Sequence, residues 1–275
     1  MSLYFIHIGM MKSATSWLYN NYYLKHKKLA TILIKEFHHL SDMSMRNRKA
    51  KKIRILKKIK NKFPYADPLE VKKYYDYLLN GSSTNYFKIF DYYKKPGYDS
   101  SPIYSSYDEE KILELKKIWP QEIKIILTIR NPINRAWSHY NHYLRNLIKQ
   151  QKKVNKITIS QILQMSKEKS LSTFLEREGF KERAFPSKII SNWEKHFKNI
   201  YIDHYENMIE SNNNFINNLN LFLFNENYDY SENFPLKKRF IPTKIPMDAM
   251  SQDMLKNFFI KELATLKNIF PKIYK

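Results

Sequence analysis

The sequence has 275 residues, 43% of them hydrophobic and 15% aromatic, which is enough for one large buried core and excludes a disordered chain. It has no cysteine, so disulfides, thiolate metal sites and cysteine nucleophiles are excluded. The formal net charge of +22 favours polyanionic partners but does not choose among nucleic acid, anionic lipid, acidic glycan and a phosphorylated nucleotide. Neither a signal peptide nor an apolar run of roughly 18 residues occurs, so we expect a cytoplasmic protein without a membrane span.

The chain begins with a predicted strand at residues 3–8, a turn at residues 9–13 and a helix at residues 15–27. A turn between a strand and a helix directs backbone N–H groups and the helix dipole at one point, which favours a bound phosphate. This order of elements therefore makes the turn the first candidate site.

The side chains of this turn suit a phosphate. Lys12 can place an ammonium on it, and Ser13, Thr15 and Ser16 can donate hydroxyl hydrogen bonds. A Walker A loop requires a second glycine where Met11 stands, so hydrolysis of a nucleoside triphosphate is disfavoured. The alternative is an ordinary strand–turn–helix with a surface lysine.

A second strand is predicted at residues 31–34, and Glu36 follows it directly. A carboxylate at a strand end beside a phosphate pocket can accept the proton of an attacking hydroxyl. The alternative is a solvent-facing glutamate paired with Lys35.

Residues 46–62 contain many basic residues and no acidic residue, while the apolar positions among them follow helical spacing. They predict a basic amphipathic helix, and we treat residues 46–80 as a helical insertion. Its basic face is either a solvated outer surface or a docking surface for an anionic acceptor.

The apolar run at residues 123–129 is typical of a strand covered on both faces of a parallel sheet, and Pro132 suits the first turn of a following helix. Arg130 stands at the carboxyl end of this strand, where open α/β sheets bind ligands, and Ser138 lies one or two turns into the helix. The two side chains can converge on one anion. Alternatively, Arg130 braces the strand–helix turn and Ser138 faces solvent.

The rest of the chain continues the alternation, with helices predicted at residues 187–197, 207–223 and 251–270 and a strand at residues 200–203. We find no internal repeat or linker. The sequence therefore predicts one α/β domain over residues 1–275, a P-loop-like doubly wound parallel sheet flanked by helices. His139 and His142 lack a carboxylate at metal-ligand spacing and are interpreted as helix-face or core histidines.

The first turn resembles the 5'-phosphosulfate loop of sulfotransferases that use 3'-phosphoadenosine-5'-phosphosulfate (PAPS), which reads Lys-(Ser/Gly)-Gly-Thr-(Thr/Ser)-x-Leu. The resemblance implies that Lys12 contacts the leaving oxygen and that the next residues hold the 5'-phosphate: Ser13, the backbone of Ala14, Thr15, Ser16 and Trp17. Ala14 departs from the family pattern, which has glycine at that position.

The segment after residues 123–129 also resembles this family, whose second motif reads Arg-(Asp/Asn)-Pro-x-x-Arg-x-x-Ser-x-Tyr. The resemblance implies that Arg130 and Ser138 bind the 3'-phosphate of PAPS, with Arg135 in a more structural position. Two phosphate motifs in the family's order make a chance match improbable.

Residues 34–39 are similar to the Lys-Glu-x-His-Phe-Phe segment of heparan-sulfate and related carbohydrate sulfotransferases, which implies that Glu36 is the catalytic base. Residues 99–104 resemble another segment of these enzymes, with Ser100 in place of a lysine. Lys238 and Arg239 stand where the family often closes a basic loop over the nucleotide.

The resemblance implies sulfuryl transfer from PAPS to a hydroxyl acceptor, with 3'-phosphoadenosine-5'-phosphate (PAP) as product and without a metal. The acceptor expected first is a glycan, and an acidic one because of the basic segment at residues 46–62. Hydroxyls of protein tyrosines, lipids and small molecules stay open as acceptors, and no nucleic acid is expected. Two alternatives stay open. One is a nucleotide-dependent phosphotransferase that uses the same loop, and the other is a non-catalytic protein that binds polyanions through the basic helix.

Overall fold

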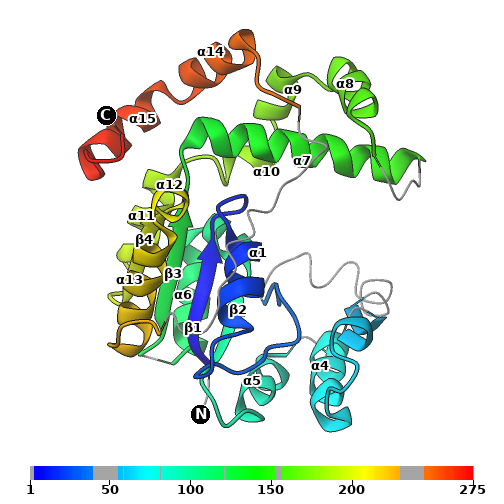
Figure 1. Ribbon diagram of the computed structural model, residues 1–275, viewed down its shortest axis with the longest axis vertical. Coiled ribbons are helices and arrows are strands. Elements are labelled where there is room, and N and C mark those ends of the chain that lie inside the picture. Colours follow the sequence, from blue (N-terminus) through cyan, green and yellow to red (C-terminus); the bar gives the residue numbers. More distant parts are fainter. Residues whose placement is uncertain are drawn as a thin grey trace.

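The described residues form a four-stranded parallel sheet with helices around it (Figure 1). The computed structural model describes residues 3–39, 55–57, 59–80, 82–120, 122–152, 157–229 and 245–274. The strand order is β2-β1-β3-β4, with β1 at Leu3–Gly9, β2 at Gly97–Ser100, β3 at Lys124–Ile129 and β4 at Ile200–His204. The predicted α/β class is confirmed, as are the strands expected at residues 3–8, 123–129 and 200–203.

The two central strands are apolar because the sheet is covered on both faces. Ile6 of β1 pairs with Asp99 of β2 and Ile125 of β3, while Ile126 of β3 pairs with Tyr201 of β4. Nearly every residue of β1 and β3 is buried, as expected for parallel strands inside an α/β domain.

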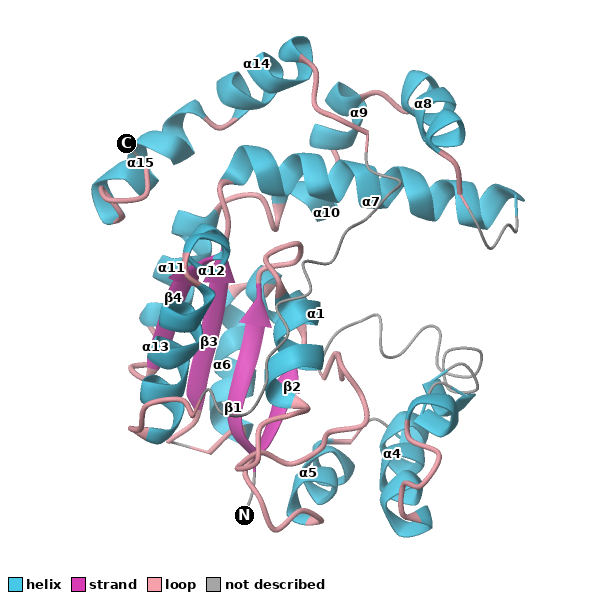
Figure 2. Cartoon of the chain, in the orientation of Figure 1, coloured by secondary structure: helices cyan, strands magenta, loops and turns pink. Residues whose placement is uncertain are grey.

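Helices pack against both faces of the sheet (Figures 1 and 2). Helix α1 (Thr15–Leu18) continues as a short π-helix, η1 (Tyr19–Tyr23), on the same face as α13 (Asn212–Phe224), and the Tyr22 hydroxyl donates to Asn220 at 2.8 Å. The other face carries α6 (Glu109–Ile118) and α11 (Pro186–Glu194), where Trp119 and Trp193 stack at a centroid distance of 6.2 Å. The sheet is doubly wound, as predicted.

A layer of helices lies across the carboxyl ends of the strands, toward which the strand arrows in Figure 2 point. It consists of α7 (Pro132–Lys152), α8 (Ile159–Glu168), α9 (Leu171–Leu175), α10 (Glu178–Lys181) and α14 (Ala249–Phe258), followed by α15 (Ile260–Ile269). Side chains of this layer form a second hydrophobic cluster, separate from the core around the sheet. None of the helices that the structure describes is long and apolar enough to cross a membrane.

Two predicted helices are interrupted. The helix expected at residues 207–223 is α12 (Tyr205–Glu210) followed by α13, with a break at Ser211, and the helix expected at residues 251–270 breaks at Phe259 between α14 and α15. The first predicted helix ends at Tyr23 instead of residue 27.

Part of the predicted basic insertion is described. Residues 55–57 and 59–62 are helical, Ile59 is buried, and Lys57 and Lys60 are exposed, in agreement with the expected amphipathic pattern. Residues 46–54 and Lys58 of that prediction lie outside the described residues. Helices α4 (Pro68–Asn80) and α5 (Ser83–Asp91) follow.

The strand predicted at residues 31–34 is wrong, because this apolar segment is an irregular loop. Tyrosine hydroxyls form hydrogen bonds with its backbone groups, which in a strand would pair with a neighbouring strand. The Tyr19 hydroxyl donates to the carbonyl of Ile32 at 2.7 Å, and the backbone N–H of Leu33 donates to the Tyr74 hydroxyl at 3.0 Å. The strand beside β1 is instead β2, which the sequence did not predict, since its glycine, aspartate and serine have low strand propensity.

Buried histidines predict how stability depends on pH. Burial lowers the pKa to about 3 for His7, to about 4 for His39, His142 and His204, and to about 2 for His139. Below pH ~6.5 the unfolded chain takes up protons that the native protein does not, so the free energy of unfolding falls as the pH drops. We expect urea unfolding to give similar stability at pH 7.5 and 7.0 and progressively lower stability between pH 6.5 and 4.5, a window above the pKa of ordinary carboxyl groups. Equal stability at pH 7 and pH 5 would contradict this.

Candidate active site

The loop after β1 is fixed to the neighbouring strand β3. The backbone N–H of Met10 donates to the carbonyl of Thr128 at 2.7 Å, and the Thr128 hydroxyl lies 2.7 Å from the carbonyl of Ser13. Gly9 has a φ of +141°, and a side chain there would approach Ser105 Oγ to 2.8 Å. The candidate phosphate loop is thus held in one conformation by the sheet below it.

Two residues of this loop have a left-handed backbone. Lys12 has a φ of +73° and Ala14 a φ of +64°, and Ala14 is the position where the sulfotransferase pattern has glycine. This conformation brings Cβ close to the following carbonyl oxygen, at a cost of roughly 1–2 kcal/mol for a residue other than glycine. The chain therefore keeps the loop shape of the motif with a residue that fits it less well.

Replacing Ala14 by glycine is expected to raise the free energy of unfolding by about 0.5–1 kcal/mol, because glycine removes the left-handed strain and loses part of the gain to its larger unfolded-state entropy. Urea denaturation measures the change. The matched control is Ala136→Gly inside helix α7, which should lower stability. If both variants are destabilised alike, Ala14 is not strained.

The two candidate phosphate motifs meet at the carboxyl edge of the sheet. Arg130, at the end of β3, donates from Nη1 to the backbone carbonyl of Lys12 at 3.2 Å. Strands β1 and β3 are neighbours whose connections leave in opposite directions, to β2 and to β4, which is the switch point where open α/β sheets bind ligands. The structure thus brings Lys12 and Arg130 together at the same edge of the sheet.

Unsatisfied polar atoms at this site fit an anionic ligand. Ser13 is fully buried and its hydroxyl has no hydrogen-bond partner among the described residues, and the same holds for Nε of the largely buried Arg130. A buried donor without a partner costs about 1–3 kcal/mol, a cost that phosphate oxygens would remove. Thr15 is buried, Ser16 is half-buried, and Trp17 packs in the core beneath the loop.

Two residues after β4 hold Arg130 and its neighbour Asn131. The guanidinium lies over the ring of Tyr205, 4.3 Å from its centroid, and Glu206 accepts the backbone N–H of Asn131 at 3.1 Å. Sequence reasoning assigned Tyr205 and Glu206 no role in the site. Their position in the sequence could have indicated a role, since they directly follow β4, the strand beside β3, at the same edge of the sheet.

Further basic groups surround Arg130. Arg135 is fully buried and donates from Nη2 to the carbonyl of Ala184 at 3.2 Å, while its Nε and Nη1 have no partner in the described part of the chain. Burial lowers the pKa of Arg135 to about 9, and the nearby charges of Arg130 and Arg183 act in the same direction. These three arginines form one basic cluster. Arg183 was missed because no motif surrounds it in the sequence.

Ser138 lies in the second turn of α7, half-buried. No hydrogen bond joins it to Arg130 among the residues that the structure describes, so their convergence on one anion stays a prediction. Lys238 and Arg239, predicted to close over the nucleotide, lie outside the described residues.

Glu36 is held by the residues beside it. Its backbone has a φ of +73°, its Oε1 accepts from Lys35 Nζ, and its Oε2 lies 3.4 Å from His38 Nε2. Partial burial would raise the pKa of Glu36, but the hydrogen bond from His38 and the charge of Lys35 outweigh it and lower the pKa to about 2. The carboxylate is therefore ionised at neutral pH.

The loop that carries Glu36 is fastened to the segment after β2, which includes the short helix η2 (Pro102–Ser106). The backbone N–H of His38 donates to Ser101 Oγ at 3.3 Å and that of His39 donates to the Tyr104 hydroxyl at 3.0 Å. Ser101 and Tyr104 in turn both donate to the buried carboxyl of Asp99, each at 2.6 Å. The two segments that resemble carbohydrate sulfotransferases thus pack together.

The charges of Lys12 and Glu36 both affect the pKa of His142. His142, on α7, has its pKa lowered to about 4, first by burial and then by the positive charge of Lys12, while the charge of Glu36 opposes the change. His142 is therefore near enough to both candidate residues for their charges to affect it. Among the described residues no group of three or more histidine, aspartate or glutamate side chains could hold a metal ion.

Comparison with known proteins shows which solved structures have a similar fold. No family model matches the sequence, and no curated protein matches it significantly. Among solved structures, a sulfotransferase from Alicyclobacillus acidocaldarius superposes with a TM-score of 0.62 at 16% identity, over 97% of this chain and 95% of that one. The chain has a sulfotransferase-like fold.

A second solved structure agrees with this fold. The sulfotransferase domain from the curacin biosynthetic pathway superposes with a TM-score of 0.51 at 11% identity, over 94% of this chain and 98% of that one. The sulfotransferase-like fold thus accounts for nearly the whole chain. The heparan-sulfate subtype expected from residues 34–39 remains an expectation.

Proposed function

We propose that this chain transfers a sulfuryl group from PAPS to an acceptor hydroxyl, with a carbohydrate as the first expected acceptor. The observation that carries the proposal is the contact between Arg130 and the backbone of Lys12, which unites the two phosphate motifs at the switch point of a sulfotransferase-like fold. PAPS carries a phosphate on each end of its ribose, and it would supply the activated sulfuryl group.

The site residues divide between the two phosphates. Around the 5'-phosphosulfate, Lys12 would stabilise the charge that develops on the bridging oxygen. The loop that follows would hold the phosphate through Ser13, the backbone of Ala14, Thr15 and Ser16, with Trp17 supporting it.

Around the 3'-phosphate, Arg130 and Ser138 would bind the oxygens, with Arg135 and Arg183 adding positive charge. Lys238 and Arg239 would close over the nucleotide from the C-terminal part of the chain. No residue in this scheme requires a metal.

Glu36 would act as the base. The acceptor oxygen forms a bond to sulfur while the bond from sulfur to the phosphate oxygen breaks, the acceptor proton passes to Glu36, and PAP leaves. A carboxylate whose pKa is about 2 is a weak base, so Lys35 must release it when the acceptor binds. Positioned bases of this kind contribute about 10²–10⁴-fold to the rate.

The test is transfer of labelled sulfate from PAPS to a panel of neutral and acidic oligosaccharides, phenols and tyrosine peptides, with magnesium and ATP offered in a parallel reaction. Labelled product from PAPS, strongest on a saccharide, is the expected result. ATP turnover without sulfate transfer would identify a phosphotransferase. Salt-sensitive polyanion binding with no turnover of either nucleotide would identify a binding protein and overturn the proposal.

A further inference from the structure

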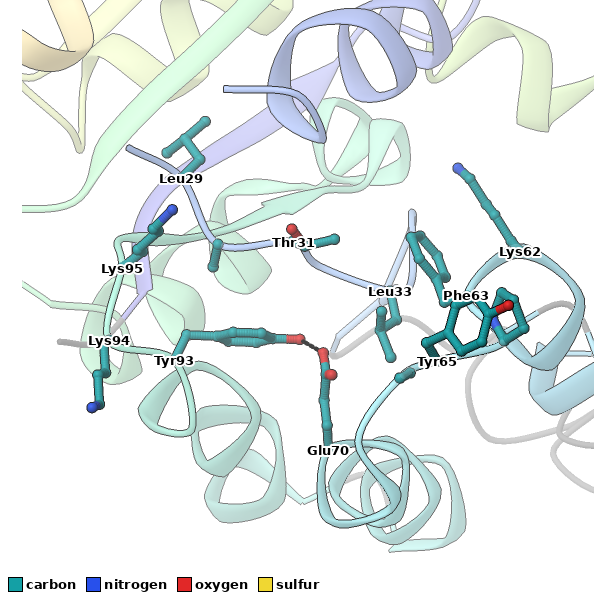
Figure 3. Close-up of a pocket in the computed structure, with 13 residues that line it drawn as sticks. Leu29, Thr31, Leu33, Lys62, Phe63, Tyr65, Glu70, Tyr93, Lys94 and Lys95 are labelled. Atoms are coloured by element: carbon teal, nitrogen blue, oxygen red, sulfur yellow. Dashed lines mark hydrogen bonds between the residues drawn. The ribbon is translucent and has the colours of Figure 1, made fainter. Parts of the chain in front are cut away.

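A pocket apart from the phosphate loop is lined by the loop at residues 29–33, by residues 62–70 of the insertion and by residues 93–95 (Figure 3). Its volume is about 610 Å³, in the range of small-molecule sites. Figure 3 shows the rings of Phe63 and Tyr65 on one side and Tyr93 on the other, with Leu33 and Glu70 between them.

One carboxylate is the polar centre of this pocket. Glu70 is only 9% exposed, and its Oε1 accepts a hydrogen bond from the Tyr93 hydroxyl. Its Oε2 has no hydrogen-bond or ion-pair partner among the described residues. Burial raises the pKa of Glu70 although the Tyr93 hydroxyl stabilises its charge. This second oxygen is accessible from the pocket that Glu70 lines, so a hydroxyl of a ligand there can donate a hydrogen bond to it.

A chain of hydrogen bonds links Glu70 to the loop of the candidate base. The backbone N–H of Leu33 donates to Tyr74 at 3.0 Å, the Tyr74 and Tyr93 hydroxyls lie 2.8 Å apart, and Tyr93 donates to Glu70. Because Tyr93 uses its proton on Glu70, Tyr74 must be the donor between the two tyrosines. Glu70 is thus the final acceptor of the chain.

The pocket is also close to Glu36. Leu33 lines it and stands three positions before Glu36 in the sequence, so their Cα atoms lie at most about 11 Å apart. An acceptor with a unit in the pocket would therefore need only a few further units to reach Glu36.

We propose that this pocket binds a saccharide unit of the acceptor that does not itself react, an inference that rests on the proposed function. A sugar ring has apolar C–H faces, which suit Phe63, Tyr65 and Tyr93, and a rim of hydroxyls, which suits Glu70. A purely apolar ligand would leave the Glu70 oxygen without a partner, and a phosphate would meet its negative charge. Lys94 and Lys95, exposed at the rim and without an acidic partner in the described residues, match an acidic substituent on the sugar.

The test is binding of single neutral and uronate-containing disaccharides, measured by saturation-transfer NMR without nucleotide. Tyr65 is 98% exposed, so Tyr65→Ala leaves the fold intact and should weaken binding about tenfold. Glu70→Gln should weaken it as well. The matched control is Tyr75→Ala, which removes a 43% exposed tyrosine of α4 that does not line the pocket and should change nothing.

Absence of binding by every disaccharide, or equal binding by wild type and Tyr65→Ala, would overturn the proposal. Titration of each variant with PAP separates this result from the proposed function. The pocket variants should bind PAP as wild type does. A chain that binds saccharide through Tyr65 but does not bind PAP would keep the pocket and lose the sulfotransferase assignment.

Discussion

Replacing Lys12 by alanine is expected to lower the rate of sulfuryl transfer by roughly 10²–10³-fold without unfolding the protein. Removal of one group that stabilises developing transition-state charge has an effect of this size. The fold should survive because the loop is held by its backbone, through Met10 and Thr128 and through the Lys12 carbonyl itself, which Arg130 contacts.

Initial rates with labelled PAPS and a saturating acceptor measure the effect, and circular dichroism checks the fold. The control is Lys188→Ala, which removes an exposed lysine of α11 and the same positive charge far from the loop. Wild-type rates in Lys12→Ala would show that the lysine does not act on the leaving group.

Replacing Glu36 by glutamine should reduce transfer by about 10²–10⁴-fold and leave PAP affinity unchanged, since the amide cannot accept the acceptor's proton. The control is Glu114→Gln, an exposed glutamate of α6. A fully active Glu36→Gln enzyme would exclude Glu36 as the base, and a parallel loss of PAP affinity would show a structural role instead.

The pH profile tests the same residue independently. The pKa of Glu36 is about 2, so the carboxylate stays ionised as the pH falls to about 4. We therefore expect no acid limb from this group between pH 5 and 7 in kcat/KM. Lys35→Met should raise the Glu36 pKa and bring such a limb toward neutral pH.

The sequence predicted the features that depend on local pattern. The continuous apolar run at residues 123–129 is typical of a buried strand in a parallel sheet, and the place of Arg130 at the strand's end follows from it. The phosphate loop followed from the strand and helix on either side of it.

Features that depend on tertiary contacts could not be predicted. Residues 31–34 have a strand's composition but are held as a loop by Tyr19 and Tyr74, and a four-residue strand at Gly97 takes the edge position. The positioning of Arg130 by Tyr205, and the basic charge of Arg183, arise from elements distant in sequence that meet at one sheet edge. The left-handed backbone of Ala14 could not be predicted either, because alanine rarely adopts that conformation.

Calorimetric titration with PAP, adenosine 5'-phosphate and adenosine 3'-phosphate tests most directly whether the two motifs hold one nucleotide. Wild type should bind PAP at least tenfold more tightly than either monophosphate. In Arg130→Ala, the preference for PAP over adenosine 5'-phosphate should fall, because the 3'-phosphate has lost one of its two direct partners. Absence of measurable heat with PAP, or equal wild-type affinity for all three nucleotides, would contradict the account.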